Sequence, residues 1–351
     1  MRIIALNNIK LLVSALEPSA NLHLTPILEM LKHYELFGIF DERLGTPYLP
    51  SSAFSIMGFL DVIPKIKKAK KAIKELVKLS FKVDKVLLID SPAFNLPLAK
   101  AIKEQNPKVE IIYYILPQVW AWKAKRVAKV EKYCDILASV LPFERRFYNR
   151  AIFVGHPLID EIKEQKQCDA TTGTLCFLPG SRKSEIRALM PIFKELVKKI
   201  DKRALLVVPE FFSQEKIEEY YGDISDFEIS RDAKEAFLRS EFAFVCSGTA
   251  TLEAALIGTP FVLAYKAKKL DYMIAKRFVK LKHVGLANIL FDFEGLAPLH
   301  QELLQEEVSV EKIWKAYQNM DREQFFQDAL VLRKILYKGA RNDMLAIITK
   351  K

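Results

Sequence analysis

The sequence lacks the features that mark several common protein classes. Its four cysteines are scattered without a Cys-x-x-Cys pair, which argues against a disulfide framework and against a zinc site. No apolar run reaches the ~18–20 residues that a membrane-spanning helix needs. Residues 1–8 lack the apolar segment and the cleavage site of a signal peptide. We therefore expect a cytoplasmic protein with reduced thiols.

Two nucleotide-binding signatures are also missing. There is no Gly-x-x-x-x-Gly-Lys-Ser/Thr motif, which excludes a P-loop NTPase. No Gly-x-Gly-x-x-Gly motif follows the first expected strand, which argues against a nicotinamide-dependent oxidoreductase. What the chain does have is 351 residues, half of them apolar, and this is enough for two hydrophobic cores.

The net charge of +11 is partly concentrated in one segment, residues 64–78. Its lysines alternate with apolar residues spaced three or four apart, which predicts a basic amphipathic helix. Such a helix suits an anionic membrane surface or nucleic acid, or it is simply the solvated outer helix of an α/β domain. No nucleic-acid-binding motif accompanies the charge, so we expect no nucleic-acid partner.

Strand-like and helix-like segments alternate along most of the chain. Because helix-length segments separate the strands, the pattern predicts βαβ units with parallel sheets, and therefore an α/β fold. The expected strands are residues 10–15, 83–89, 109–115, 136–140, 151–154, 174–178, 204–208, 242–245 and 261–265. The polar stretch 160–173 is the expected linker between two doubly wound halves, and from residue 308 the pattern is helical.

Two turns have the composition of phosphate-binding sites. Ser247, Gly248 and Thr249 separate an apolar strand from a helix that ends at Gly258, and a free helix N-terminus attracts anions. Glu253, one turn into that helix, can accept hydrogen bonds from a sugar. The alternative is an ordinary turn with a Ser or Thr cap.

The second turn, Gly180-Ser181-Arg182, also lies between a strand and a helix. Arg182 can bind a phosphate through two parallel hydrogen bonds, or it forms a plain surface ion pair. Together the two turns resemble a clamp for a diphosphate.

Two carboxylates directly follow expected strands. Asp90 follows residues 83–89, and Glu17 follows residues 10–15. A carboxylate at such a position is a candidate general base, or else it caps the next turn. His156, before Pro157, is the weaker catalytic candidate, because a lone histidine in such a loop is more often structural.

Aromatic and apolar residues gather in two places. Trp120 and Trp122 lie beside a Lys/Arg cluster and suit sugar stacking, a membrane interface, or a loop packed on the core. The second group precedes the lysine-rich segment and suits an acyl chain or, more ordinarily, core packing. Its members are Phe54, Ile56, Met57, Phe59 and Leu60.

Several short motifs follow one another in a recognisable order. They are Leu-Pro-Gln-Val-Trp-Ala-Trp at 116–122, Leu-Pro-Phe-Glu at 141–144, Gly-His-Pro at 155–157, Leu-Pro-Gly-Ser-Arg at 178–182, and Ser-Gly-Thr-Ala-Thr-Leu-Glu at 247–253. With Asn288 further on, the chain resembles the lipid-A-disaccharide synthases, inverting glycosyltransferases of bacteria. The resemblance runs from about residue 10 to about residue 305.

This resemblance implies a fold and a reaction. The fold would be GT-B, two Rossmann-like domains around a central cleft, with residues 1–165 on the acceptor side, 166–320 binding the UDP-sugar, and 321–351 returning to the first domain. The donor would be UDP-2,3-diacylglucosamine, and the acceptor 2,3-diacylglucosamine 1-phosphate (lipid X). No metal or other cofactor is implied. The protein would lie peripherally on the cytoplasmic face of the inner membrane, and pairing of two copies through the C-terminal helices stays open.

The resemblance also implies roles for individual residues. Asp90 matches the family's essential acidic residue, and Arg182 matches a nucleotide-contacting arginine. Glu253 and Asn288 match nucleotide-site positions. The residue 55–61 block matches a region that takes acyl chains or touches the membrane. The likeness leaves open whether Asp90 or Glu17 is the base.

The chain departs from the family pattern around its first turn. The family's Gly-Glu-x-Ser-Gly-Asp reads Leu-Glu-Pro-Ser-Ala-Asn at residues 16–21, and an expected second aspartate is Ala93. These changes affect the acceptor side more than the nucleotide side. They keep two alternatives open. One is another nucleotide-sugar enzyme of the same fold, either a transferase to a different lipid acceptor or an epimerase, and the other is a non-catalytic protein that binds a nucleotide sugar or lipid.

Overall fold

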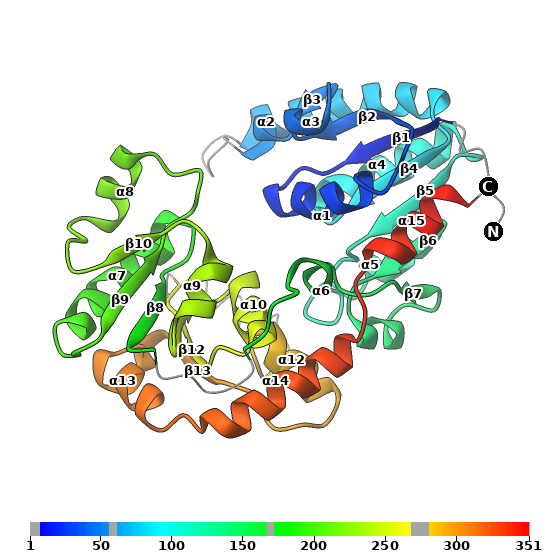
Figure 1. The fold of residues 1–351 in the computed structure, drawn as a ribbon. Helices are drawn as coiled ribbons and strands as arrows, with labels where there is room; N and C mark the ends of the chain where they lie inside the picture. The colour runs from blue at the N-terminus through cyan, green and yellow to red at the C-terminus, as the bar shows by residue number, and fades with distance from the viewer. Residues whose placement is uncertain (1–7, 56–61, 167–171, 268–280, 351) are drawn as a thin grey trace. The chain divides into compact units, whose positions relative to one another are not determined.

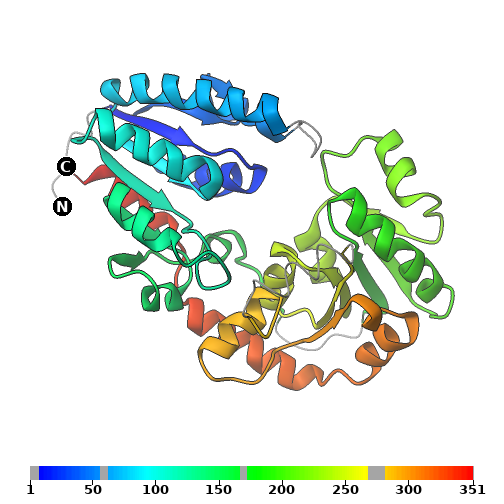
Figure 2. The same cartoon turned by 180° about the vertical axis from the view of Figure 1, so that it is seen from behind.

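The computed structural model describes residues 8–55, 62–166, 172–267 and 281–350. The chain divides into two compact units: Met1–Asp160 with Lys338–Lys351 forms the first, and Glu161–Tyr337 forms the second. In each unit a parallel β-sheet lies between two layers of helices (Figures 1 and 2). The expected pair of doubly wound α/β folds is therefore confirmed.

The first sheet has the strand order β3-β2-β1-β4-β5-β6-β7, with every pair parallel. The strands are β1 (Ile9–Ser14), β2 (Tyr34–Phe40), β3 (Leu49–Pro50), β4 (Lys85–Ile89), β5 (Glu110–Tyr114), β6 (Ile136–Ser139) and β7 (Ala151–Phe153). The chain reverses its direction across the sheet between β1 and β4. In doubly wound sheets, ligands bind beyond the carboxyl ends of the strands at such a switch point.

Helices cover both faces of the first sheet (Figures 1 and 2). On one face lie α3 (Val62–Leu79), α4 (Pro92–Gln105) and α5 (Arg126–Tyr133), and on the other α1 (Pro18–Leu28) and α15 (Arg341–Thr349). The first unit also contains two short helices, α2 (Ser52–Ser55) and α6 (Pro157–Glu161), and the 3₁₀ segments η1 (Glu42–Leu44), η2 (Ser80–Lys82) and η3 (Pro142–Arg146). Strand β4 is buried along its whole length, as a central strand covered on both faces requires.

The second sheet repeats the same winding with the order β10-β9-β8-β11-β12-β13, again all parallel. The strands are β8 (Thr174–Leu178), β9 (Arg203–Val207), β10 (Glu228–Ser230), β11 (Phe242–Cys246), β12 (Phe261–Tyr265) and β13 (Gln301–Leu304). Its switch point falls between β8 and β11, so the turns after these two strands meet at one edge.

The helices of the second unit also form two layers. One layer holds α7 (Lys183–Val197), α8 (Gln214–Tyr221) and α13 (Val310–Gln318). The other holds α9 (Ala233–Arg239), α10 (Thr249–Ile257), α12 (Leu286–Phe293) and α14 (Arg322–Leu336). The core between α7 and the sheet is rich in phenylalanine, and the rings of Phe177, Phe193 and Phe244 contact one another.

The C-terminal helices do not return to the first unit at residue 321, as expected, but at Lys338. Helix α14 stays in the second unit because its apolar side is buried there, including Phe325 and Leu332. Arg333 fixes it further, because its Nε donates to the Leu256 carbonyl at 2.8 Å. Only α15 packs against the first unit, beside α1. Pairing of two copies through these helices stays a prediction.

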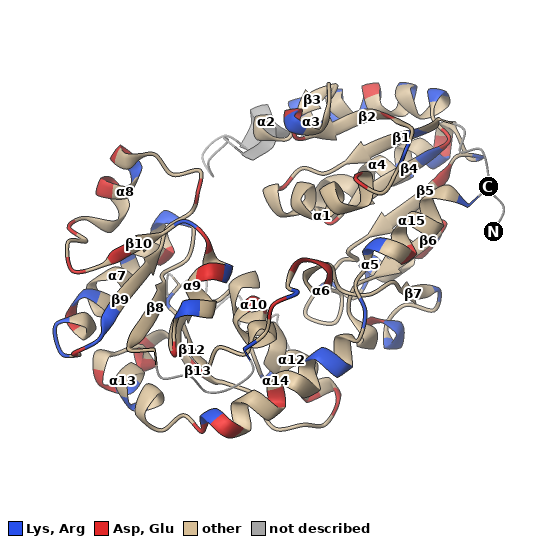
Figure 3. Ribbon diagram, viewed as in Figure 1, with Lys and Arg blue, Asp and Glu red and all other residues tan. Residues whose placement is uncertain are grey.

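Helix α3 confirms the expected basic amphipathic pattern, within the side chains that the structure describes. Ala72, Leu76 and Val77 are buried in the core of the first unit. The opposite face carries exposed lysines, visible as blue bands along α3 in Figure 3. Because the apolar face of residues 67–79 is already used by the core, this described part of α3 offers a partner mainly its charge. Among the described residues, no helix is long and apolar enough to span a membrane.

Candidate active site

The two phosphate-type turns of the second unit lie side by side. Strands β8 and β11 are parallel neighbours with Leu178 opposite Val245, so both turns leave the same sheet edge. Gly180 has φ +97°, and a Cβ there would lie 2.6 Å from Glu185 Oε2 and 3.2 Å from Cys246 Sγ. The position therefore needs glycine twice over, for its backbone conformation and for its close approach to the end of β11.

Arg182 is the N-cap residue of α7 and points outward from this edge. Its Nη1 donates to Glu185 Oε1 at 2.7 Å, while its side chain remains 76% exposed. Glu185 is buried, and its other oxygen accepts from the Arg182 backbone N–H. Hydrogen bonding to this carboxylate raises the pKa of Arg182. Glu185 thus holds the permanent positive charge of Arg182 beside the turn. The role of Glu185 could have been predicted from the Arg-x-x-Glu spacing at the start of a helix.

The N-terminus of α10 meets the requirements of an anion site. Gly248 is the N-cap and supplies no side-chain cap. The Gly248 carbonyl accepts from the hydroxyl of Thr251 at 2.8 Å and from its N–H at 3.2 Å, so this N–H is already used within the first turn. Gly248 and Thr249 are exposed, as is Ser181 on the neighbouring turn. The helix ends at Gly258 in the left-handed conformation, as expected from the sequence.

The two remaining nucleotide candidates differ in their surroundings. Glu253 is half-buried, one turn into α10. Asn288 is only 1% exposed, and its amide is occupied within the protein. Its Nδ2 donates to the His300 carbonyl at 2.9 Å and to Glu302 Oε1 at 2.8 Å, and its Oδ1 accepts from the His300 N–H. The structure therefore gives Asn288 a packing role in α12, and contact with a nucleotide stays a prediction.

Asp90 begins a strained turn at the carboxyl end of β4. Asp90 and Ser91 have φ +50° and +43°, a left-handed conformation that non-glycine residues rarely adopt. The Asp90 carbonyl is held by Tyr113 Oη and by Asn95 Nδ2, each at 2.7 Å. The Ser14 hydroxyl from β1 fixes Asn95 in turn, with its Oγ 2.6 Å from Asn95 Oδ1. This network fixes the backbone through the Asp90 carbonyl and does not involve the half-buried carboxylate.

The electrostatic surroundings of Asp90 suit a base. Burial raises its pKa, while the Ser91 N–H and the charge of His23 lower it. His23, on α1, was not singled out from the sequence. Its charge also lowers the pKa of His156, which burial brings to about 3, so His156 is neutral. His23, Asp90 and His156 thus share one neighbourhood at this edge of the first sheet.

Glu17 lies exposed after β1, at the N-cap of α1. Ser14 is opposite Leu88, so this turn and that of Asp90 leave adjacent strands. Asn21 secures the divergent turn: its Nδ2 donates to the carbonyls of Ala15 and Glu17, and its Oδ1 accepts from the Asp41 N–H at 2.8 Å. The loss of the family's aspartate here is therefore compensated by an amide that can donate as well as accept.

The two tryptophans have different environments. Trp120 is buried, and its Nε1 donates to Glu144 Oε1 at 3.2 Å, so it is no stacking platform. Trp122 is 42% exposed. Lys123 Nζ lies 4.1 Å and Arg126 Cζ 5.2 Å from the centre of its ring. Phe54 is placed by its backbone in α2, while Ile56, Met57, Phe59 and Leu60 lie outside the described residues.

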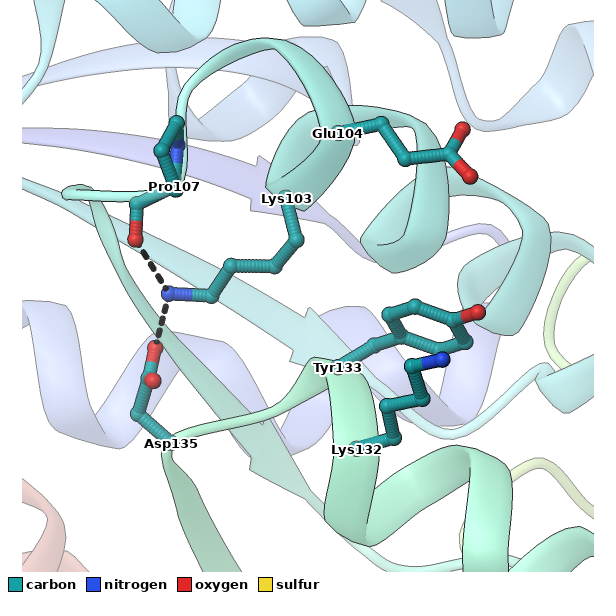
Figure 4. A pocket seen from close by; sticks show the side chains of 6 residues that line it. All are labelled: Lys103, Glu104, Pro107, Lys132, Tyr133 and Asp135. Carbon is teal, nitrogen blue, oxygen red and sulfur yellow. Dashed lines mark hydrogen bonds and ion pairs between the residues drawn. The ribbon is translucent and has the colours of Figure 1, made fainter.

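An open pocket of about 430 Å³ lies elsewhere on the first unit (Figure 4). Its lining residues precede β5 and β6, whereas Asp90 follows β4, so it opens at the opposite edge of the sheet. Lys103 Nζ is bonded to Asp135 at 2.7 Å and to the carbonyls of Pro107 and Val109. Its cation is thereby neutralised, and we assign the pocket no role in the chemistry.

Within the described ranges, no group of three or more His, Cys, Asp or Glu side chains is placed to hold a metal ion. Cys134, Cys176 and Cys246 are buried free thiols, and burial raises their pKa. They are therefore unreactive packing residues.

Comparison with known proteins agrees with this architecture. Residues 11–342 match the family model described as Lipid-A-disaccharide synthetase. Lipid-A-disaccharide synthase of Campylobacter jejuni is 51% identical, over 97% of this chain and 99% of that protein. The enzyme of the same name from Helicobacter pylori strain Shi470 is 50% identical, over 94% of this chain and 95% of that protein.

Among solved structures, the fold is similar to a putative UDP-N-acetylglucosamine 2-epimerase from Listeria monocytogenes, with a TM-score of 0.61 at 14% identity over 97% of this chain and 96% of that one. It is also similar to CalG4, the calicheamicin glycosyltransferase, with a TM-score of 0.58 at 13% identity over 97% and 98%. These two show the fold alone. The two synthases are 51% and 50% identical to this chain over nearly its full length, and this decides the family: this chain belongs to the lipid-A-disaccharide synthases.

Proposed function

We propose that this chain condenses UDP-2,3-diacylglucosamine with 2,3-diacylglucosamine 1-phosphate. The products are the β-1′,6-linked tetraacyl disaccharide 1-phosphate and UDP. Family membership supports the reaction. The main structural support for a nucleotide site is the pair of adjacent turns after β8 and β11, beside which the buried carboxylate of Glu185 holds Arg182. The resemblance to an epimerase concerns the fold alone and does not favour that activity.

The second unit would bind the UDP moiety. The N-terminus of α10 and the guanidinium of Arg182 supply positive charge to a diphosphate, which gains negative charge as the sugar leaves. Ser181, Gly248 and Thr249 line the exposed side of the two turns. Glu253, one turn further, would accept from the sugar hydroxyls.

The first unit would supply the base. The 6-hydroxyl oxygen of the acceptor attacks C1 of the donor sugar, the C1–O bond to UDP breaks, and the hydroxyl proton passes to Asp90. Attack opposite the leaving diphosphate inverts the configuration at C1. A pKa raised by burial makes Asp90 a stronger base than an exposed aspartate. Glu17, on the adjacent turn, is the alternative.

A release assay tests this function. UDP release should require the donor and diacylglucosamine 1-phosphate together, in mixed micelles. An acceptor without its acyl chains serves as the matched substrate control. If UDP were released from the donor equally fast with and without an acceptor, the donor would be transferred to water, and this would contradict the transferase assignment.

We propose that the displacement needs no metal, because Arg182 and a helix N-terminus would carry the charge of the leaving group. Extensive dialysis against EDTA is therefore expected to leave kcat within about twofold of its starting value. A larger loss that added Mg²⁺ or Mn²⁺ restores would contradict this.

We further propose that the enzyme docks peripherally on anionic membranes through the charge of α3 and through Trp122. Each lysine near an anionic surface contributes about 1 kcal/mol, so neutralising four should weaken vesicle binding at low salt by at least about a hundredfold. The variant replaces these lysines by glutamine: Lys67, Lys70, Lys71 and Lys74.

Cosedimentation with phosphatidylglycerol vesicles measures this effect. A matched control replaces four exposed lysines that lie directly after α7 or on α13: Lys198, Lys199, Lys312 and Lys315. Equal losses in both variants would show nonspecific attraction, and no loss in the α3 variant would remove α3 from the docking surface.

A further inference from the structure

Glu144 is a carboxyl group buried in the first unit, and neither the chemistry above nor the expected site uses it. It lies in η3, directly after β6, and is 1% exposed. Its Oε1 accepts from Trp120 Nε1 at 3.2 Å. Its Oε2 lies 2.8 Å from Ser139 Oγ and 3.4 Å from the Leu141 backbone nitrogen.

The hydrogens at this site can be counted. Ser139 Oγ lies 2.7 Å from the Leu141 carbonyl oxygen as well as 2.8 Å from Glu144 Oε2. A serine hydroxyl has one hydrogen, and a carbonyl can only accept. With Glu144 ionised, one of these two contacts would join oxygen to oxygen with no hydrogen between them. With Glu144 protonated, its hydrogen goes to Ser139, and the hydrogen of Ser139 goes to Leu141.

The other surroundings agree with a neutral acid. Burial raises the pKa of Glu144 to about 7, although hydrogen bonding with Ser139, with Trp120 and with the backbone at Leu141 and Val140 lowers it. Tyr148, which follows η3, also faces it; the charge of Glu144 raises the pKa of Tyr148, and Arg126 on α5 lowers it. Arg145 and Arg146 flank Glu144 in the chain but are exposed to solvent.

Glu144 and Tyr148 together hold the loop after β5. Besides the bond from Trp120 to Glu144, Tyr148 Oη donates to the Pro117 carbonyl at 2.8 Å. The rings of Trp120 and Phe143 meet edge to face at 5.2 Å. This loop carries the exposed Trp122 and leaves β5, whose last residue Tyr114 accepts from the Asp90 N–H at 3.0 Å. A shift at Glu144 would therefore reach the strand end next to Asp90.

We propose that Glu144 is a positioning residue that works as a neutral carboxylic acid, donating its proton to Ser139 while accepting from Trp120, and so fixes the loop of Trp122. The sign of the pH effect follows from linkage. The folded-state pKa lies above the ordinary value, so the bonded form is complete at low pH and is lost as the pH rises through about 7.

Glu144→Gln tests the proposal, because glutamine keeps the shape of the protonated acid and its two side-chain bonds: Nε2 donates to Ser139 and Oε1 accepts from Trp120. It gives up only the long contact of 3.4 Å with the Leu141 N–H. The ratio of variant to wild-type kcat should be within about twofold of one near pH 6 and rise above pH 7, where only the wild type ionises. Glu144→Ala, which removes both bonds, should lose activity throughout. A loss of more than about tenfold in Glu144→Gln across the whole range would overturn the proposal.

A spectroscopic measurement decides the protonation state directly, whatever the activity of the variants. The infrared difference spectrum of wild type minus Glu144→Gln should contain the carbonyl stretch of a protonated carboxylic acid near pH 6. That band should fade as the pH rises through about 7. Carboxylate bands alone near pH 6 would show an ionised Glu144 and overturn the proposal.

Discussion

Asp90→Asn is expected to lower kcat by about 10²–10⁴-fold, the usual contribution of a general base. The amide keeps the shape of the side chain but cannot take the proton of the acceptor hydroxyl. The turn itself should survive, because the backbone of Asp90 is held by Tyr113, Tyr114 and Asn95 through its carbonyl and its N–H. UDP affinity should be unchanged, since the proposed nucleotide turns are in the second unit.

The pH profile gives an independent check on Asp90. A base must be ionised, so kcat should fall as the pH drops through the pKa of Asp90, which burial places above the ordinary aspartate value. The asparagine variant should lose this acid limb. Glu104→Gln is the matched control, an exposed acid-to-amide change at the other edge of the same sheet. Near-normal kcat in Asp90→Asn, with a collapse in Glu17→Gln, would move the base to Glu17.

Arg182→Ala is expected to weaken UDP binding by about 10- to 100-fold, the effect of losing a charge-assisted hydrogen bond to phosphate. Calorimetric titration with UDP measures this directly. The UDP affinity of Arg182→Lys should lie between those of the wild type and Arg182→Ala, because an ammonium keeps the charge without the paired donors of a guanidinium. Glu185→Gln should also weaken binding, since it removes the charge that holds Arg182 in place.

The matched control for Arg182 is Arg187→Ala, an exposed arginine on the same helix, whose contact with Glu219 is a long surface ion pair of 3.9 Å. It should bind UDP with wild-type affinity. If Arg182→Ala bound UDP within about twofold of wild type, the pair of turns after β8 and β11 would not be the diphosphate site.

Much of the fold was predictable because buried parallel strands are continuous apolar runs. β4, β8 and β11 are examples. β2 escaped notice because its first residues are exposed and its sequence is interrupted by Gly38. The glycine is needed for its own φ of +115° and also for its neighbour β1, because a Cβ there would lie 2.1 Å from the Val13 carbonyl oxygen. Such a close approach between residues 13 and 38 leaves no mark in a local sequence pattern.

The candidate site was predictable where it depends on strand ends. The turns at Asp90, Gly180 and Ser247 all follow apolar strands, and the two switch points bring them to the ligand-binding edge of each sheet. Partners distant in sequence were not predictable. The amide of Asn288 is consumed by His300 and Glu302.

The lysine-rich segment shows the same limit. Its period predicted the amphipathic helix α3, but periodicity cannot tell what covers an apolar face. The structure shows that the core of the first unit covers it, which leaves an electrostatic role for the lysines.

The most direct test of the proposed function is the structure of the product. The purified protein is incubated with UDP-2,3-diacylglucosamine and diacylglucosamine 1-phosphate in mixed micelles, and the product is examined by mass spectrometry and by NMR of its anomeric linkage. We predict a tetraacyl disaccharide 1-phosphate with a β-1′,6 bond, formed at least about a hundredfold more slowly by Asp90→Ala. An α-linked product, or no disaccharide although UDP protects the protein against thermal unfolding, would contradict the proposed inverting transfer.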